Sequence, residues 1–485
     1  MRIFFLLLLV AGGGVGRAQT RREDIHTDFV LYNRRVALEK DLRERMIGRH
    51  FSLPLDSNSE DAYLSGCWAV GQFLFDGPEV RQGFDRLFAG YEALGYDTRR
   101  ALLEAVYAVE PDRYRREEAG LIDEERDPHL WALCAVYLYR ADSSSVAVAD
   151  ELKIKLVERF PGYDSVMVLR DLMGWLGDRP AARPPMEELF GFGVKTIYSF
   201  QRQDRDYPGL AVVQDSDGKF VRDEAGRLQV FEQLARSGPG LPFFLTNGNT
   251  PQGVYSIQGT DISRTNFIGP TPNLQLLLPA EEDWGKYFHD SAAVGSDSLS
   301  RYLGLLPPGW RGYAPMMEAW EAGVAGRTAI IAHGTTIDPE YYRGRPFYPL
   351  TPTMGCLCAK ELWNVTSGHL LVSEQNNLVN AFLSTPGRKG FLVVVDVDDK
   401  REAVSRAEVE EWVRAFESKK PSRLRRLCRT PGSGGFWDSL EWQIVDRFGD
   451  VVWRGNTGRR AGLGGIPLRF AAGVGAAAFG APAAQ

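Results

Sequence analysis

A proline-rich segment at residues 177–185 divides the sequence into two parts with different hydrophobic periodicity. Before it, apolar residues recur at the spacing of a helix face, as in Val148, Leu152, Leu156 and Phe160. After it, runs rich in β-branched and aromatic residues, such as residues 194–200, are typical of strands. The pattern predicts an α+β protein with a helical module over residues 19–178, a linker over residues 179–190 and a mainly β domain with helical insertions over residues 191–400.

The predicted helical module consists of several short amphipathic helices. Asp127 and Pro128 give one of them a capping residue followed by a proline at the first helical position. No strict repeat period is found, but short helices joined by brief turns are typical of a helical hairpin array. Such arrays bind protein partners or act as structural supports, and the sequence leaves both roles open.

The C-terminal part of the sequence changes character twice. Residues 391–397 form a nearly continuous apolar run, which favours a buried strand. Ser405 and Glu408 then form a capping box, so residues 401–420 are expected to hold a helix that packs on the β domain. Residues 421–485 are first basic and then rich in glycine and alanine, and we expect this tail to be poorly ordered.

The N-terminus has the features of a secretory signal peptide. A basic residue at position 2, a short apolar run over residues 3–10 and small residues before position 19 predict cleavage after Ala18. No later apolar stretch reaches the length of a transmembrane helix. The mature chain is therefore expected in the periplasm or elsewhere in the cell envelope. With a formal net charge of −6 and an isoelectric point near 5.7, it lacks the basic character of a nucleic-acid-binding protein.

The residues most suggestive of chemistry are a histidine and a cysteine. His333 ends the apolar run of residues 328–332, and Cys356 follows Gly355. A thiol becomes an efficient nucleophile when an imidazole takes its proton, and a glycine beside it lets backbone N–H groups approach a developing oxyanion. The alternative is that both are ordinary buried residues, as free cysteines and lone histidines often are.

The cysteine count also bears on this interpretation. Five cysteines in an exported chain leave at least one thiol unpaired. Cys67 and Cys134 either form a disulfide or are buried separately as small apolar residues. Cys356 and Cys358 form a Cys-x-Cys pair, but no second His/Cys cluster lies nearby at the spacing of a zinc site, so no metal site is expected.

Three segments in order resemble the catalytic domain of L,D-transpeptidases, which are cysteine-dependent enzymes that modify peptidoglycan. The first is Thr250-Pro251-x-Gly253-x-Tyr255, the second is His333-Gly334-Thr335, and the third is Thr353-x-Gly355-Cys356-Leu357. The resemblance covers roughly residues 194–399. The sequence departs from the family at Met354, where a second histidine is common, and at Cys358, where a polar residue is usual.

The resemblance implies a thioacyl mechanism on peptidoglycan stem peptides. Cys356 would attack the carbonyl of the third-position diamino acid and expel the terminal D-alanine, with His333 as base and later acid. An amine of a second stem would resolve the thioacyl enzyme and form a crosslink. Backbone at Gly355 and Cys356 would hold the oxyanion, and Thr353, Gly334 and Thr335 would shape the pocket. No cofactor is implied.

Three other interpretations stay open. On the same scaffold, water in place of the amine would make the protein an L,D-carboxypeptidase or murein peptide hydrolase. The replacement at Met354 and the large helical module are compatible with a non-catalytic cell-wall-binding protein. A metal-dependent hydrolase is the weakest of the three, because the sequence offers no matching ligand cluster.

Overall fold

The computed structural model describes residues 20–140, 146–177, 182–290 and 298–419, together with the backbone of two short strands. The chain divides into two compact units, residues 1–421 and 422–485. In the second unit, β11 (Glu441–Val445) pairs antiparallel with β12 (Val451–Asn456). The expected signal peptide, the fifth cysteine at position 428 and the rest of the expected tail lie outside the described residues.

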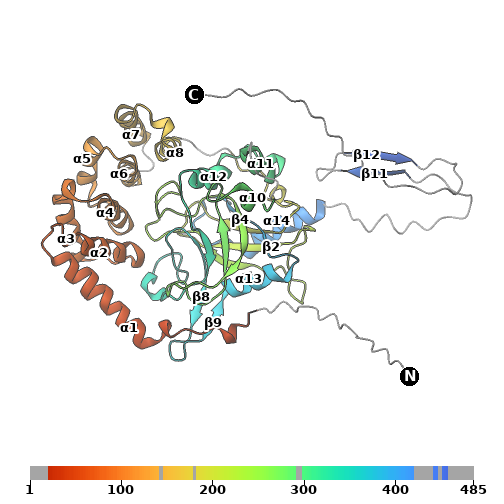
Figure 1. The fold of residues 1–485 in the computed structure, drawn as a ribbon, viewed down its shortest axis with the longest axis horizontal. Helices are drawn as coiled ribbons and strands as arrows, with labels where there is room; N and C mark the ends of the chain where they lie inside the picture. The colour runs from red at the N-terminus through yellow and green to blue at the C-terminus, as the bar shows by residue number, and fades with distance from the viewer. Residues whose placement is uncertain are drawn as a thin grey trace, which may run out of the picture. The chain divides into compact units, whose positions relative to one another are not determined.

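The predicted helical module is present, and its helices follow one another in an arc along one side of the strands (Figure 1). Its helices are α1 (Tyr32–Lys40), α2 (Glu60–Phe73), α3 (Pro78–Ala89), α4 (Tyr96–Val109), α5 (Arg115–Glu124), α6 (Pro128–Arg140), α7 (Val146–Arg159) and α8 (Met167–Trp175). A π-helical segment, η3 (Asp41–Arg49), continues α1. Short 3₁₀ turns are η1 (Arg22–Asp24), η2 (Asp28–Val30), η4 (His50–Ser52), η5 (Tyr91–Ala93) and η6 (Tyr163–Ser165).

Helix α6 shows how the local sequence sets these elements. The Asp127 carboxylate accepts hydrogen bonds from the N–H groups of His129 (2.9 Å) and Leu130 (3.1 Å), so the predicted cap is confirmed. The apolar face of α6 includes the fully buried Trp131 and packs against α4, α5 and α8. Cys67 and Cys134 are both free thiols buried in this core, which makes them separate packing residues.

The second part of unit 1 is a closed eight-stranded barrel. Its order is β1-β10-β4-β5-β6-β7-β3-β2, with β1 parallel to β10, β6 parallel to β7 and the other neighbours antiparallel. The strands are β1 (Thr196–Gln201), β2 (Gly209–Gln214), β3 (Phe231–Leu234), β4 (Gly253–Asp261), β5 (Asn273–Leu277), β6 (Ile331–His333), β7 (Leu357–Ala359) and β10 (Gly390–Asp396). A separate pair, β8 (Glu361–Trp363) and β9 (Leu370–Ser373), follows β7.

Strand β10 is buried on both faces, as its apolar run predicts. Leu392 and Val394 join the apolar cluster that fills the barrel, to which α13 (Glu374–Ser384) adds Leu378 and Phe382. On its other face, β10 contributes to a second cluster, which is covered by α9 (Met186–Leu189) and α14 (Arg406–Lys419). Helix α14 begins with the expected capping box, and α9 lies inside the segment expected as a linker.

The insertion between β5 and β6 is helical and packs on the same second cluster. It contains α10 (Trp284–Phe288), α11 (Ser298–Leu305), η7 (Pro308–Trp310), η8 (Ala314–Met317) and α12 (Glu318–Val324). Among the described residues, no helix combines the length and apolar character needed to cross a membrane. The architecture is α+β with a helical region followed by a β domain with helical insertions, as the sequence predicts, and the structure shows that the β domain is a closed barrel.

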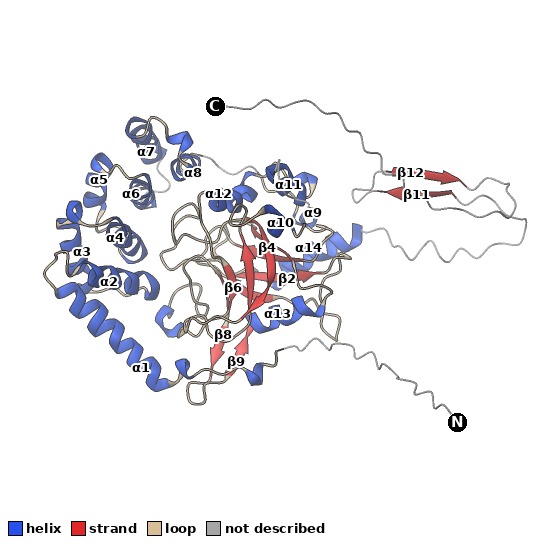
Figure 2. Cartoon of the chain, viewed as in Figure 1, coloured by secondary structure: helices blue, strands red, loops and turns tan. Residues whose placement is uncertain are grey.

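The core of the helical module includes residues of the barrel loops that follow β3 and that connect β6 and β7, and Figure 2 shows α1–α8 on the opposite side of the strands from α13 and α14. The segment between these two strands includes η9 (Pro339–Tyr342), and it buries Tyr342 and Phe347 in the core of the helical module. The Tyr342 hydroxyl donates to the Gln72 carbonyl of α2 at 2.8 Å. The helical module, which precedes the barrel in the chain, thus covers the segment between β6 and β7.

Candidate active site

The turn before Cys356 is held by two threonine hydroxyls. Thr353 Oγ1 accepts the Gly355 N–H (3.0 Å) and donates to the Cys356 carbonyl (2.8 Å), while Thr250 Oγ1 donates to the Gly355 carbonyl (2.9 Å). Gly355 has a φ of +110°, which only glycine adopts readily. A Cβ there would lie 2.1 Å from Arg327 Nη2, so the backbone approaches this guanidinium as closely as a glycine permits.

The register of β6 and β7 determines where the histidine and the cysteine lie. His333 is paired with Cys358, and Ala332 with Leu357, so Cys356 stands beside Ile331. Ala332 and Leu357 belong to the cluster that fills the barrel, so alternation along the strands puts His333 and Cys358 on the other face, and Cys356 lies in the bend just before β7. Strand spacing and a two-residue offset put the Cα atoms of His333 and Cys356 ~8 Å apart.

The Cys356 thiol has backbone partners in the resting structure. Its sulfur accepts the Ile331 N–H (3.4 Å), and the thiol donates to the Ala329 carbonyl (3.6 Å). The side chain is partly exposed. Burial raises the pKa of the Cys356 thiol, whereas the Ile331 N–H and the Arg327 guanidinium act to lower it. Cys356 and His333 are both among the described residues, and no hydrogen bond joins the thiol to the imidazole. The resting pair is therefore a neutral thiol and a neutral imidazole.

His333 is oriented for proton transfer by its own main chain. Its Nδ1 lies 2.5 Å from the Gly334 carbonyl, which can only accept, so Nδ1 carries the proton and Nε2 has a free lone pair. The residue is 5% exposed, and burial lowers the pKa of His333 to about 4. The imidazole is therefore neutral near pH 7 and can accept a proton at Nε2.

A buried carboxyl group that the sequence did not single out supports this histidine. Glu361 in β8 accepts the Thr335 N–H (2.9 Å) and the Ser373 hydroxyl (2.6 Å). A Cβ on Gly334 would lie 2.2 Å from its carboxyl carbon, so a side chain there would displace the carboxyl group. Burial raises the pKa of Glu361 to about 8. The His333-Gly334-Thr335 segment is thus folded around Glu361.

The predicted site residues therefore separate into two groups. Cys356, His333 and the backbone of Gly355 lie at the candidate site, whereas Gly334 and Thr335 hold the turn behind it. The Thr335 hydroxyl accepts the Ile337 N–H (3.1 Å), and its carbonyl accepts the Trp363 indole N–H (2.8 Å). Thr353 Oγ1 accepts the Gly355 N–H, so of the two N–H groups expected to face an oxyanion, that of Gly355 is already hydrogen-bonded.

Cys358 has a different environment from Cys356. It is buried, its sulfur lies 3.5 Å from Thr351 Oγ1, and burial raises the pKa of its thiol to about 12. A neutral, enclosed thiol is a poor nucleophile. Across the described ranges, no group of three or more His, Cys, Asp or Glu side chains is placed to hold a metal ion.

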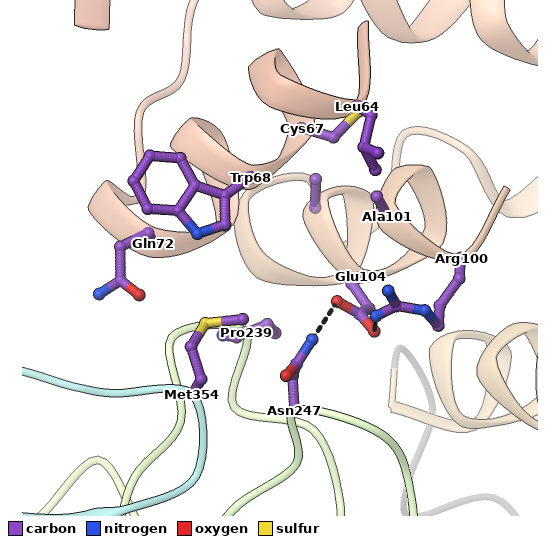
Figure 3. Close-up of a pocket in the computed structure, with 12 residues that line it drawn as sticks. Leu64, Cys67, Trp68, Gln72, Arg100, Ala101, Glu104, Pro239, Asn247 and Met354 are labelled. Atoms are coloured by element: carbon purple, nitrogen blue, oxygen red, sulfur yellow. Dashed lines mark hydrogen bonds and ion pairs between the residues drawn. The ribbon is translucent and has the colours of Figure 1, made fainter. Parts of the chain in front are cut away.

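A cavity of about 140 Å³ opens between the helical module and the loop that carries Cys356 (Figure 3). Helices α2 and α4 line one side with Trp68 and Glu104, and the barrel loops line the other with Asn247 and Met354. Met354 lies two residues before Cys356, so the cavity adjoins the turn that presents the thiol. The Glu104 carboxylate accepts from Asn247 Nδ2 at 2.9 Å, as drawn in Figure 3.

No family model matches the chain, and neither a curated protein nor a solved structure matches it significantly. The interpretation therefore depends on the geometry of the site and on the sequence motifs.

Proposed function

We propose that this protein transfers acyl groups through a thioester on Cys356, with peptidoglycan stem peptides as substrates and L,D-transpeptidation as the reaction. The substrate class comes from the resemblance of three segments to L,D-transpeptidases. The observation that carries the proposal is the parallel register of β6 and β7, which pairs His333 with Cys358 and sets Cys356 beside Ile331. No cofactor is needed in this scheme.

The first half-reaction forms the thioester. His333 Nε2 takes the Cys356 proton as the sulfur attacks the carbonyl carbon, and the Cys356 N–H donates to the oxyanion. When the tetrahedral intermediate collapses, the C–N bond breaks and the imidazolium returns the proton to the leaving D-alanine amine. In the second half-reaction the amine of another stem attacks, His333 removes its proton, and the sulfur leaves as the thiol.

The resting electrostatics dictate the timing of the first proton transfer. The pKa of His333 is about 4, and burial holds the pKa of the Cys356 thiol above its usual range. The imidazole is thus a weaker base than the thiolate, so complete proton transfer before attack is unfavourable. The proton therefore moves as the carbon–sulfur bond forms, and no stable thiolate–imidazolium pair precedes it.

Hydrolysis of the thioester is the second candidate reaction. The cavity next to Met354 is small, about 140 Å³, and the helical module lines one of its walls. A water molecule enters such a space more easily than a second peptide stem does, which favours an L,D-carboxypeptidase or murein peptide hydrolase on the same scaffold.

Mass spectrometry of the purified protein tests the proposal. Incubation with a disaccharide tetrapeptide or with a carbapenem is expected to add a covalent acyl group to Cys356, and Cys356→Ala should abolish the adduct. Crosslinked dimers among the products indicate transpeptidation, and tripeptides alone indicate hydrolysis. A folded protein that forms no adduct with either compound contradicts acyl transfer. It would leave the non-catalytic wall-binding role, which predicts that Cys356→Ala retains peptidoglycan binding.

A further inference from the structure

Arg327, just before β6, is a cation with an unusual set of partners. Its Nη1 donates to the carbonyls of Phe243 (2.7 Å) and Asn249 (3.0 Å), and its Nη2 donates to the Gly248 carbonyl (2.5 Å). Within the described part of the chain, no carboxylate pairs with it. Because all these acceptors are uncharged carbonyl oxygens, the positive charge of the guanidinium is not neutralised by a carboxylate and acts on neighbouring groups.

The neighbour of that charge is the turn that presents Cys356. Nη2 would be 2.1 Å from a Cβ on Gly355, so the guanidinium lies directly against the residue before the thiol. The position two residues after the cysteine, where the resembling family usually has a polar residue, is the buried thiol of Cys358. Arg327 approaches the same turn from a different part of the chain.

The loop whose carbonyls hold Arg327 is anchored to the helical module. Asn247 lies in this loop with a φ of +55°, an uncommon conformation for a residue with a side chain. Its Nδ2 donates to Glu104 of α4 at 2.9 Å, and the other oxygen of Glu104 accepts from Arg100 at 2.7 Å. A continuous set of contacts therefore runs from α4 through Asn247 and Arg327 to Gly355.

We propose that Arg327 provides the positive charge that stabilises the Cys356 sulfur as it becomes anionic and that the helical module holds this charge in place through the Glu104–Asn247 hydrogen bond. The inference deepens the proposed acyl transfer and depends on Cys356 being its nucleophile. It makes Arg327 an electrostatic partner of the thiol, and Asn247 and Glu104 positioning residues. The helical module then contributes to reactivity as well as to support.

The other titratable groups around the thiol do not compete for this role. His333 and Cys358 are paired on the neighbouring strands and are neutral near pH 7, because burial lowers the pKa of the first to about 4 and raises that of the second to about 12. Tyr255 faces Arg327, and burial raises its pKa as well. Arg327 is thus the charged group, among those described, that acts on the pKa of Cys356.

The test is the pH dependence of Cys356 alkylation by iodoacetamide in the full-length protein, followed on the Cys356 peptide by mass spectrometry. Arg327→Gln is expected to raise the thiol pKa by about one unit or more, which is about a tenfold slower reaction at pH 7. Arg327→Lys keeps the charge and should shift the pKa less. Asn247→Gly keeps the positive φ accessible while removing the contact with Glu104, and it should shift the pKa in the same direction by a smaller amount.

Arg159→Gln is the matched control. Arg159 in α7 also donates to backbone carbonyls, those of Glu124 and Glu125, so this variant loses the same kind of contact within the helical module. Its Cys356 thiol pKa should equal that of the wild type. An unchanged thiol pKa in a folded Arg327→Gln protein overturns the proposal, as do equal shifts in Arg327→Lys and Arg327→Gln or a shift in the Arg159 control.

Two features keep the test decisive. If Arg327→Gln does not fold, Asn247→Gly still decides, because an unchanged thiol pKa in that folded variant contradicts the coupling. Alkylation requires no stem peptide, so the result is independent of whether the protein acylates Cys356 with peptidoglycan fragments. A failed acyl-transfer assay together with the expected thiol shifts would reject the proposed substrate and retain the role of Arg327.

Discussion

Substitution of Gly355 by alanine tests the local geometry of the site most directly. At a φ of +110°, a side chain adds backbone strain of about 1–2 kcal/mol. The new methyl group would also lie 2.1 Å from Arg327 Nη2 and 2.7 Å from the Gly248 carbonyl, and overpacking of this kind costs about 1–3 kcal/mol. We therefore expect Gly355→Ala to lose about 2–5 kcal/mol of stability.

The matched control is Gly344→Ala. Gly344 also has a positive φ, +84°, but an added Cβ meets no atom within 4 Å. Only the backbone strain of about 1–2 kcal/mol should appear there. The difference between the two variants isolates the contact with Arg327 and Gly248, which we place at about 1–3 kcal/mol.

Urea unfolding followed by tryptophan fluorescence measures both variants, and Cys356 alkylation is measured in parallel. The unfolding midpoint of Gly355→Ala is expected to fall by an amount on the order of 1 M, and clearly more than that of the control. Its thiol should also react more slowly, because the methyl group displaces the guanidinium. Equal midpoints for the two variants would refute the reasoning that the turn is packed against Arg327.

Three further predictions follow from the same contacts. Cys356→Ser should abolish acylation in mass spectra, whereas Cys358→Ser should retain an adduct on Cys356, because Cys358 is enclosed and its pKa is about 12; an adduct that follows Cys358 would contradict this assignment. His333→Gln should slow acylation about 10²–10⁴-fold while leaving the Cys356 thiol pKa nearly unchanged, since the resting thiol makes no hydrogen bond to the imidazole; a thiol pKa that rises by a full unit would indicate a resting ion pair instead. Folding raises the pKa of Glu361 from about 4.3 to about 8. Between these pH values the folded state therefore binds more protons than the unfolded state, so the free energy of unfolding falls as the pH increases from about 4.3 to 8. Glu361→Gln should therefore lose less thermal stability between pH 5 and pH 8 than the wild type, and an equal loss in scanning calorimetry would show that another group is responsible.

Much of the fold could be predicted because its signals are local. The cap at Asp127 and the capping box at Ser405 and Glu408 mark helix starts through contacts within three residues, and both are present. The apolar run of β10 predicts a strand covered on both faces, which the two clusters around it confirm. Patterns of this kind depend on hydrogen bonds and burial along one element, so a single sequence contains them.

The candidate site could be predicted only in part. The sequence singled out Thr353 and Gly355 beside Cys356, and the structure shows that they form a turn held by the Thr353 hydroxyl. Glu361 has no comparable signal, because its role depends on the pairing of β8 with β9 and on the close approach of Gly334. The sequence does not distinguish Glu361 from the other glutamates, because its contacts are made by residues that meet only in the folded structure.

The sequence by itself determined the division into helical and β parts, the element starts and the choice of His333 and Cys356 as candidate reactive groups. Only the tertiary structure decided that a parallel strand pair brings the segments of the two groups side by side, that Arg327 lies against Gly355 and that α4 contacts Asn247 through Glu104. The physical reason is the range of the interactions. Periodicity and capping act over a few residues, whereas the charge beside the thiol arises where segments 28 and more than 200 residues away from Gly355 in the sequence meet in space.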